Sequence, residues 1–179
     1  PGKVRVIGGR WRGRKLLLAR ADIRPTPDRL RETLFNWLAP DLRGCRVLDL
    51  FAGSGALGIE AISRGAAHCT SVETDRPTAA HLRTLMAELD NDAFTVVIDD
   101  ARRFISQSSQ QRFDLVFLDP PYDKGFGARA LAAAQTGGWL APEALIVWEE
   151  RLPQDAPEGF ALLDSRRYGD STVTLLRAP

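Results

Sequence analysis

Residues 46–58 read RVLDLFAGSGALG, in which a short apolar run leads directly into glycines and then into a helical pattern. The run predicts a buried strand, and Gly53, Gly55 and Gly58 form a G-x-G-x-x-G pattern between that strand and a helix. Glycines at such a turn allow a tight bend and let a ligand approach the backbone. Glu73 follows 20 residues after Gly53, at the end of the next predicted strand, where a carboxylate can accept hydrogen bonds from ribose hydroxyls. The stretch therefore predicts an α/β fold that binds a nucleoside-containing cofactor.

The rest of the chain continues the alternation of strands and helices. Apolar runs predict further strands at 69–73, 94–98, 113–118 and 143–150, and amphipathic patterns predict helices at 57–65, 77–89, 101–107 and 126–135. Before them, Thr26 is a candidate cap for a helix that Pro40 would end. The tail at 160–177 has a glycine between two strand patterns, which predicts an antiparallel pair at the sheet edge. Strands that alternate with helices indicate a mostly parallel sheet with helices on both faces.

Asp49, on the first of these strands, bears on the kind of cofactor. Its negative charge would repel a diphosphate but attract a cation, and S-adenosylmethionine (SAM) carries an ammonium and a sulfonium group. We therefore favour SAM over a nicotinamide dinucleotide, whose pyrophosphate would sit at the helix N-terminus. Further along, Asp99 or Asp100 could accept a hydrogen bond from the adenine amino group. Two alternatives stay open: Asp49 could brace the loop, and one aspartate could cap the next helix, for which Asp99 is the better candidate.

Residues 117–122, FLDPPY, place an acid, two prolines and an aromatic ring at the end of the fourth predicted strand. In such a sheet that end lies beside the first strand, at the edge where ligands bind. Pro120 and Pro121 restrict the backbone and remove two N–H donors, which leaves the Asp119 carboxylate and the Pro120 carbonyl as rigid acceptors. These acceptors suit an NH₂ group, and Tyr122 offers a face on which a base could stack. We therefore predict methyl transfer to a nucleobase amine, with a rigid structural loop as the alternative.

The net charge of +1 conceals a basic amino-terminal segment. The first 31 residues carry ten Lys and Arg against two Asp, whereas the remainder carries 14 basic and 21 acidic residues. Within residues 4–20, apolar and basic residues alternate around Gly8, Gly9 and Gly13, which predicts a β-hairpin. A basic segment on an acidic body suggests a polyanionic partner, with nucleic acid the first candidate and a solvated basic surface the alternative.

Taken together, these residues resemble the class I SAM-dependent methyltransferases that modify exocyclic amino groups. Four stretches are similar to the RsmD family of bacterial 16S ribosomal RNA guanine-N2 methyltransferases: RVIGGRWRGRKL (5–16), RPTPDRLRETLFNWL (24–38), VLDLFAGSGALGIEAISRGA (47–66) and VFLDPPY (116–122). The first two stretches are specific to that family, whereas the glycine loop and DPPY are shared with many amino methylases. The resemblance extends from about residue 4 to the YGDSTVTLL tail.

This resemblance implies a Rossmann-like class I domain with a seven-stranded, mostly parallel sheet, an antiparallel C-terminal hairpin and a small basic N-terminal hairpin. It also implies SAM as methyl donor and the N2 amine of one guanine in 16S rRNA as acceptor, within an assembled or nearly assembled 30S subunit. The implied cofactor-binding residues are Asp49, Phe51, Gly53, Gly55, Glu73, Asp100 and Ala101. The guanine amine would meet Asp119, Pro120 and Tyr122, and RNA phosphates would meet Arg5, Arg10, Arg12, Arg14, Lys15, Arg29 and Arg31.

The remaining expectations concern organisation and location. We divide the chain into a basic extension at 1–24 and a methyltransferase domain at 25–179. No apolar run approaches the roughly 20 residues of a membrane span, and no signal peptide pattern begins the chain. Cys45 and Cys69 lack metal-ligand spacing and fit a reducing cytosol. We therefore expect a cytoplasmic monomer that needs no metal.

Three other functions fit part of the pattern. An adenine-N6 methyltransferase acting on DNA or RNA also uses DPPY, although such DNA enzymes usually carry a large base-recognition insert for which the short connections leave no room. A dinucleotide-dependent oxidoreductase needs a catalytic donor such as a placed histidine, whereas His68 and His81 fall on a strand start and a helix pattern. An inactive RNA-binding module is the third, and the intact DPPY argues against it.

Overall fold

The computed structural model describes residues 2–20, 22–23, 26–120 and 125–179. Its elements are β1 (Lys3–Arg5), β2 (Lys15–Leu17), α1 (Asp28–Leu42), β3 (Arg46–Asp49), α2 (Ala56–Ser63), β4 (His68–Glu73), α3 (Arg76–Asp90), β5 (Phe94–Ile98), α4 (Ala101–Ile105), β6 (Phe113–Leu118), α5 (Phe126–Thr136), β7 (Leu140–Glu150), β8 (Ala161–Tyr168) and β9 (Ser171–Arg177). The predicted strands and helices therefore form close to their expected positions.

Seven strands form one sheet in the order β5-β4-β3-β6-β7-β9-β8, and β1 pairs with β2 in a separate small sheet. Strands β3 to β7 run parallel to one another, and β9 is antiparallel to both β7 and β8. The strand order reverses between β3 and β6, which are adjacent in the sheet although α2 to α4 separate them along the chain. This confirms the mostly parallel sheet, the antiparallel C-terminal pair and the separate N-terminal hairpin.

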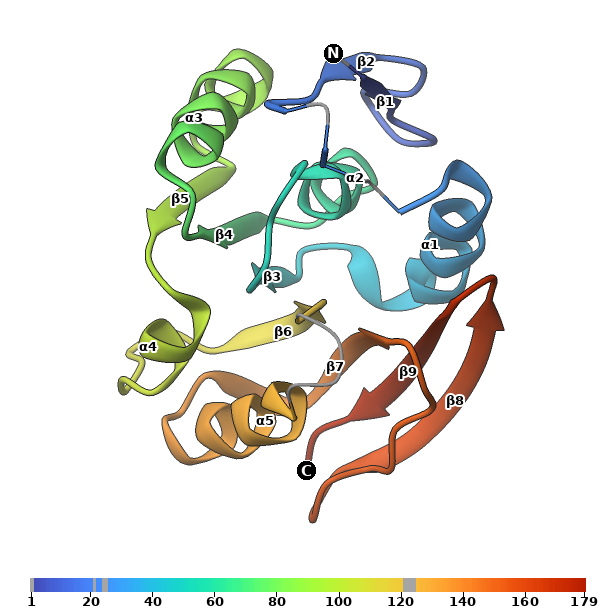
Figure 1. The fold of residues 1–179 in the computed structure, drawn as a ribbon, viewed down its shortest axis with the longest axis vertical. Coiled ribbons are helices and arrows are strands. Elements are labelled where there is room, and N and C mark those ends of the chain that lie inside the picture. Colours follow the sequence, from blue (N-terminus) through green and yellow to red (C-terminus); the bar gives the residue numbers. More distant parts are fainter. Residues whose placement is uncertain (1, 21, 24–25, 121–124) are drawn as a thin grey trace.

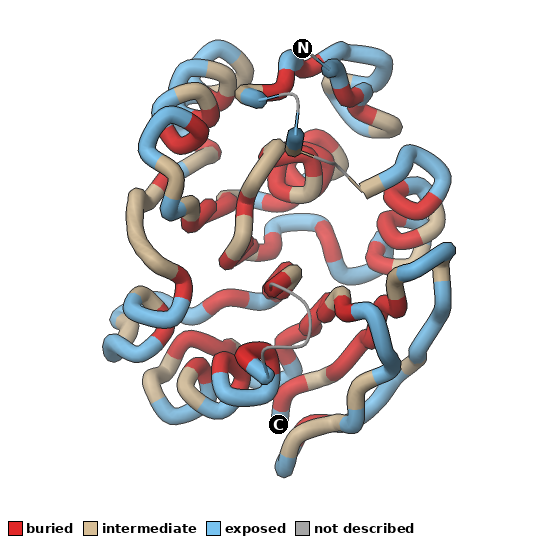
Figure 2. The backbone as a smooth tube through the Cα atoms, in the orientation of Figure 1, coloured by how far each residue is buried: buried red, intermediate tan, exposed pale blue. Residues whose placement is uncertain are grey.

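The helices cover the two faces of the sheet unequally (Figure 1). Helices α1, α2 and α3 lie on one face, whereas α4 and α5 lie on the other. Buried residues follow the strands and the inner sides of the helices, as Figure 2 shows along the backbone. Because parallel strands are covered on both faces, their sequences are nearly continuous apolar runs, as in the FDLVFL of β6.

Helix α1 corrects two expectations about its ends. The helix continues through Pro40 to Leu42, and Pro27 rather than Thr26 precedes its first residue, without a side-chain cap. Pro40 removes one intrahelical hydrogen bond, and its ring crowds the carbonyl four residues earlier. It lies on the exposed side of the last turn. Leu38 and Leu42, both buried against the sheet, hold that turn in place. Packing of the apolar side therefore outweighs the local cost of Pro40.

The N-terminal hairpin packs firmly on the main domain rather than projecting from it. Apolar residues of β1, β2 and their flanks share a core cluster with α2 and α3; from the hairpin these are Val4, Val6, Leu16 and Leu18. The turn between the strands lies over the end of α2, where the Ser63 hydroxyl donates to the Gly8 carbonyl (2.6 Å) and accepts from the Trp11 N–H (3.0 Å). The Arg10 N–H donates to the Ser63 carbonyl (2.9 Å). Side-chain and backbone hydrogen bonds therefore fix the turn to α2.

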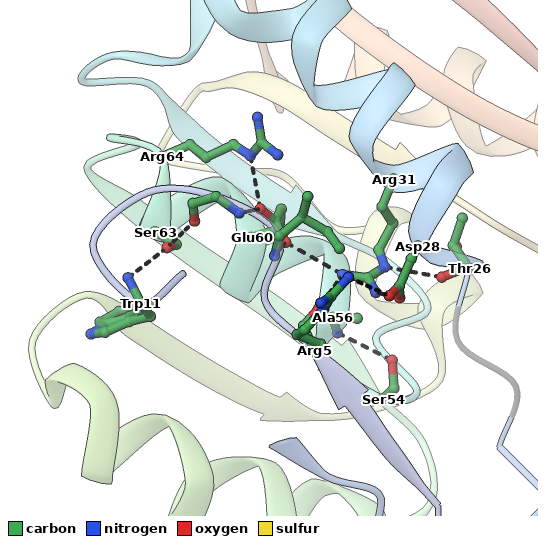
Figure 3. Close-up of polar contacts among 12 residues, drawn as sticks. Arg5, Trp11, Thr26, Asp28, Arg31, Ser54, Ala56, Glu60, Ser63 and Arg64 are labelled. Carbon is green, nitrogen blue, oxygen red and sulfur yellow. Dashed lines mark hydrogen bonds and ion pairs between the residues drawn. The ribbon is translucent and has the colours of Figure 1, made fainter. Parts of the chain in front are cut away.

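A buried carboxylate completes this attachment (Figure 3). Glu60 of α2 is 0% exposed, and its two oxygens accept hydrogen bonds from the Ile7 and Gly8 N–H groups, both at 2.9 Å. Arg31 of α1 donates to the same carboxylate at 3.3 Å, and Arg64 donates at 2.7 Å. The hairpin, α1 and α2 therefore meet at one charged group in the interior.

Gly9 and Gly13 provide a matched pair for testing how the hairpin is docked. Both adopt left-handed backbone conformations, with φ of +81° and +83°. A methyl group added at Gly9 would lie 1.9 Å from the Ser63 carbonyl oxygen, whereas one added at Gly13 would meet nothing within 4 Å. We expect Gly13→Ala to cost about 1–2 kcal/mol of unfolding free energy for its backbone strain. Gly9→Ala should cost a further 1–3 kcal/mol or so, because the turn must move off α2.

Urea unfolding of both variants measures the difference in their unfolding free energies. Hydrogen exchange at the Arg10 and Trp11 amides reports whether the turn has detached from α2. Gly9→Ala should accelerate that exchange, and Gly13→Ala should leave the Trp11 amide protected. Equal unfolding free energies for the two variants would mean that the contact with Ser63 contributes nothing to docking.

Candidate functional site

A cavity of about 670 Å³ opens at the carboxyl ends of β3, β4 and β5, beside the point where the strand order reverses. Its lining comprises Leu50, Phe51, Gly53, Val72, Glu73, Thr74, Asp99, Asp100, Ala101, Arg102, Phe126 and Arg129. Five of the residues predicted to bind a cofactor are among them: Phe51, Gly53, Glu73, Asp100 and Ala101. The volume lies in the range of small-molecule sites, and the place is where open α/β sheets bind ligands.

The glycines of the first loop serve different purposes. Gly53 has a φ of +52° and open space around the position of a Cβ, so its backbone is accessible from the cavity. Gly55, with a φ of +77°, precedes α2, and a Cβ there would lie 2.7 Å from the Leu82 side chain. At Gly58 a Cβ would lie 2.6 Å from Cys69 Sγ, so this glycine lets α2 approach β4. Of the three glycines, only Gly53 lines the cavity, and the other two allow close packing.

Glu73, the predicted ribose acid, braces the loop from the neighbouring strand. One carboxylate oxygen accepts the Gly53 N–H at 3.0 Å, and the other accepts the Asp75 N–H at 2.9 Å. A carboxylate offers about four lone-pair sites, so Glu73 retains acceptor capacity for two hydroxyls. The residue therefore couples the shape of the loop to the ligand it would hold.

The two aspartates after β5 differ in their partners. Asp100 caps α4, since its carboxylate accepts the Arg102 N–H at 2.8 Å, and it also forms an ion pair with the Arg102 side chain. Those contacts with Arg102 hold the pKa of Asp100 below its usual value. Asp99 accepts the Asp100 N–H at 2.8 Å. Capping was an open alternative for which Asp99 was the better candidate; the cap is Asp100, and both residues line the cavity.

Asp49 lies at the end of β3 with 3% of its surface exposed, outside the residues that line the cavity. Burial raises its pKa to about 7, the Phe51 backbone hydrogen bond opposes that rise, and the charge of Glu73 adds to it. A buried carboxyl group whose ionised form lacks a counter-charge attracts a cation to its vicinity. The electrostatics of the loop therefore favour a positively charged ligand over a phosphate.

Asp119 and Pro120 follow β6, and Tyr122 lies outside the described residues. Asp119 does not line the large cavity. It lines a narrow crevice on the α1 side of the sheet, together with Glu149 at the end of β7. Burial raises the pKa of Asp119 to about 8, and the charges of Glu149, Asp49 and Glu150 add to the shift. The charge of Asp49 therefore acts on the Asp119 carboxyl group, although Asp119 lines the crevice and not the cavity.

All but one of the predicted RNA-binding residues lie on the surface. Six are exposed: Arg5, Arg10, Arg12, Arg14, Lys15 and Arg29. Among the described residues no carboxylate pairs with Arg12, Arg14, Lys15 or Arg29, whereas Arg5 pairs with Asp28 and Arg10 pairs with Asp90.

Arg31 is a correction to the predicted RNA-binding set. It is 1% exposed, and its guanidinium donates to the Thr26 and Arg5 carbonyls and to Asp28 and Glu60. A guanidinium whose donors are used internally cannot contact a phosphate, so Arg31 has a structural role.

Several residues at the site escaped sequence reasoning. Phe126, at the start of α5, lines the cavity and packs edge-on against Phe51 with ring centroids 5.5 Å apart. Two acids were also missed: Glu149, at the strand end beside Asp119, and Glu60, which lies away from the cavity and holds the hairpin on α2. For Glu149 a signal existed, because an acid at the end of the strand after FLDPPY falls at the same edge of a parallel sheet.

Two further findings concern metal ions and membranes. In the described part of the chain, no group of three or more His, Cys, Asp or Glu side chains could hold a metal ion. Of the helices in the same part, none is both long enough and apolar enough to cross a membrane.

The raised pKa of Asp119 predicts a pH dependence of stability in the ligand-free protein. Because the folded-state pKa lies above the unfolded value of 3.8, folding favours the protonated form. Compared with a permanently neutral residue, Asp119 therefore does not change the free energy of unfolding below about pH 4. Between about pH 4 and pH 8 it lowers that free energy by a growing amount. We expect Asp119→Asn to stabilise the protein increasingly from pH 5 to pH 8, by at most about 1.4 kcal/mol per pH unit. Urea unfolding at pH 5, 6.5 and 8 measures this, and a difference that does not vary with pH would contradict it.

Comparisons with known proteins agree with these observations. A family model described as conserved hypothetical protein 95 matches residues 4–177. The chain is 45% identical over 157 residues to a protein of Escherichia coli K12 named ribosomal RNA small subunit methyltransferase D, covering 87% of this chain and 79% of that protein. A protein of the same name from Haemophilus influenzae is 40% identical over 174 residues, covering 94% and 90%.

Solved structures give the same result for the fold. The Escherichia coli protein yhhF superposes with a TM-score of 0.91 at 41% identity, covering 99% of this chain and 98% of that one. A structure from Haemophilus influenzae superposes with a TM-score of 0.84 at 38% identity, covering 98% of both chains. The chain therefore belongs to the family of conserved hypothetical protein 95, which is the RsmD family that its motifs indicate.

Proposed function

We propose that this protein transfers a methyl group from SAM to the exocyclic N2 amine of a guanine in the 16S rRNA of the small ribosomal subunit. The observation that carries the proposal is the position of Asp119 and Pro120, beside a glycine-loop cavity, in a chain whose relatives are named as small-subunit rRNA methyltransferases. The motif resemblance supports guanine N2 as the acceptor. We further propose that the protein acts as a monomer on an assembled or nearly assembled subunit.

The chemistry of the cavity fits SAM. When bound, SAM supplies an electrophilic methyl group on a sulfonium that leaves as a neutral thioether. Glu73 has lone pairs for the ribose hydroxyls and holds the Gly53 N–H at the same time. Phe51 and Phe126 give the cavity apolar surface for a base, and Asp100 lies at its edge as an acceptor for the adenine amine. Asp49 and Gly55, just behind the lining, would supply negative charge and loop shape for the methionine part.

The acceptors after β6 would act on the guanine amine. An exocyclic amine is a poor nucleophile because its lone pair is delocalised into the ring. The Asp119 carboxylate and the Pro120 carbonyl would accept its two protons and stabilise the positive charge that develops on nitrogen during attack. Hydrogen bonds to a carboxylate, and a cation beside it, favour its ionised form, so substrates would lower the pKa of Asp119 from its raised value. Tyr122 would provide the stacking face, and Asp119 could take the released proton.

The hairpin would position the RNA. Its exposed basic residues lie on an element that Glu60 and Ser63 fix to α2, so phosphates bound there would stand at a constant distance from the catalytic edge. We assign RNA contact to the extension at 1–24 together with Arg29, and catalysis to residues 25–179. The target base must leave its stack to reach Asp119, or be presented already exposed.

Labelled methyl transfer to small subunits tests the proposal. Purified 30S particles from cells that lack their own methylation at the target would be incubated with SAM carrying a labelled methyl group, and the digested nucleosides analysed. We expect N2-methylguanosine as the product. Asp119→Ala should reduce transfer by more than about 100-fold, the lower end of effects seen when a transition-state partner is removed.

Two controls accompany this measurement. Titration calorimetry should show that Asp119→Ala still binds SAM, because the residue lies outside the cavity lining. Asp114→Ala, at the opposite end of β6, should retain transfer activity. If the labelled product were N6-methyladenosine, the substrate would be adenine and not guanine. Full activity of Asp119→Ala would contradict the proposed role of the acceptors.

The role of the hairpin predicts a change in salt dependence. Replacing Arg12, Arg14 and Lys15 with alanine should weaken RNA binding and reduce the slope of log affinity against log salt by about 0.7–0.9 for each lost phosphate contact. A double Arg43→Ala and Arg112→Ala variant removes exposed charges outside the hairpin and should keep the original slope. Filter binding of 16S rRNA fragments at 50–300 mM salt would measure both, and an unchanged slope in the triple variant would exclude these contacts.

A further inference from the structure

The end of β7 places a second carboxylate next to Asp119. Leu118 of β6 and Trp148 of β7 are register partners in the parallel sheet, so the residues that follow them, Asp119 and Glu149, are neighbours on adjacent strands. Strand neighbours lie about 4.8 Å apart across the sheet. Both residues line the crevice on the α1 side, and both are partly exposed at its mouth. Their carboxylates therefore share one face of the sheet.

The neighbouring acid, Glu150, faces the other way. Alternate residues of a strand point to opposite faces, so Trp148 and Glu150 share the face opposite Glu149. Two contacts agree with this: Trp148 Nε1 donates to Glu150 at 3.1 Å, and the Trp148 ring packs closely on Gly127 of α5. Of the two glutamates, only Glu149 lines the crevice with Asp119.

Adjacent carboxylates repel each other, and a proton or a hydrogen-bond donor between them relieves that repulsion. Burial is the main cause of the raised pKa of Asp119, and the charge of Glu149 is the next largest. One carboxylate and one carbonyl satisfy the two protons of an amine. A carboxylate offers about four lone-pair sites, so Glu149, beside them, can accept a further donor from the substrate in addition to its contacts within the protein.

Guanine and adenine differ at the atom next to their amine. In guanine, N1 carries a proton, so N1–H and the N2 amine form a continuous row of donors. In adenine, N1 carries a lone pair beside the N6 amine, and a carboxylate facing it would be repelled. Pairing of an acidic side chain with an N–H donor, and its failure with an acceptor, is the usual way in which a polar site discriminates between bases.

We propose that Glu149 accepts the N1–H of guanine while Asp119 holds the N2 amine, so that Glu149 selects guanine over adenine. This inference rests on the proposed function and adds the residue that determines its base specificity. The crevice encloses only about 10 Å³, so the base edge would meet the two carboxylates at the mouth rather than enter the crevice.

Glu149→Gln tests the proposal with a substituted substrate. Splint-ligated 16S rRNA, assembled into small subunits, would carry either guanine or 2-aminopurine at the methylated position. 2-Aminopurine keeps the 2-amine but has a lone pair at N1. The wild type should methylate the guanine substrate much faster. In Glu149→Gln the amide N–H can donate to that lone pair, so the ratio of kcat/KM for guanine to kcat/KM for 2-aminopurine should fall by roughly 10- to 100-fold, as expected for one base contact.

Comparing this ratio between the wild type and Glu149→Gln cancels the other differences between the two bases, which include O6 and the intrinsic reactivity of the amine. Glu150→Gln is the matched control and should leave the ratio unchanged, because its side chain faces the other side of the sheet. SAM affinity and melting temperature, measured for each variant, separate recognition from folding.

An unchanged ratio in Glu149→Gln, or an equal loss on both substrates, would overturn the role of Glu149 while leaving the proposed function intact. Absence of transfer from the wild type to the guanine substrate would overturn both.

Discussion

The Glu60 carboxylate is the interaction on which the arrangement of the molecule depends. An ionised carboxylate without solvent costs several kcal/mol unless its oxygens are fully satisfied. Here two backbone N–H groups and two guanidinium groups supply the donors, and they come from the turn at 7–8, from Arg31 and from Arg64. Loss of any partner would leave part of this charge unsatisfied, so the contacts favour the observed packing of the hairpin, α1 and α2. The basic residues of the hairpin thereby acquire a definite position relative to the sheet.

Charge separation follows from this arrangement. The exposed basic residues lie on the hairpin, whereas Asp49, Asp119 and Glu149 gather at the carboxyl ends of the strands. In the proposed function, RNA phosphates would be attracted to the first region and repelled from the second. A nucleotide would then approach Asp119 with its base directed inward and its phosphates toward the hairpin. The acidic edge therefore favours a base amine, which donates hydrogen bonds, over the backbone that carries it.

Much of this could be predicted from local sequence, and the failures have a common cause. The strands, the glycine loop and the acids at the ends of β4 and β5 are local patterns, and the structure places them as expected. Pro40 was misjudged because the burial of Leu42, a tertiary effect, extends α1. Arg31 looked like its basic neighbours because composition does not show which guanidinium turns inward. The role proposed for Glu149 depends on register between β6 and β7, and no local pattern encodes the pairing of Leu118 with Trp148.

The acidic edge also links ligand binding to folding. Asp49 and Asp119 are held where burial and neighbouring charge oppose ionisation, so the ligand-free protein bears an electrostatic cost there as pH rises. A cation bound at the glycine loop lowers that cost, and a ligand that binds only the folded state stabilises it. It would also favour the ionised form of Asp119, which accepts the protons of an amine. Cofactor binding would therefore prepare the acceptor for the base, and the residues that destabilise the isolated protein are those to which we assign its chemistry.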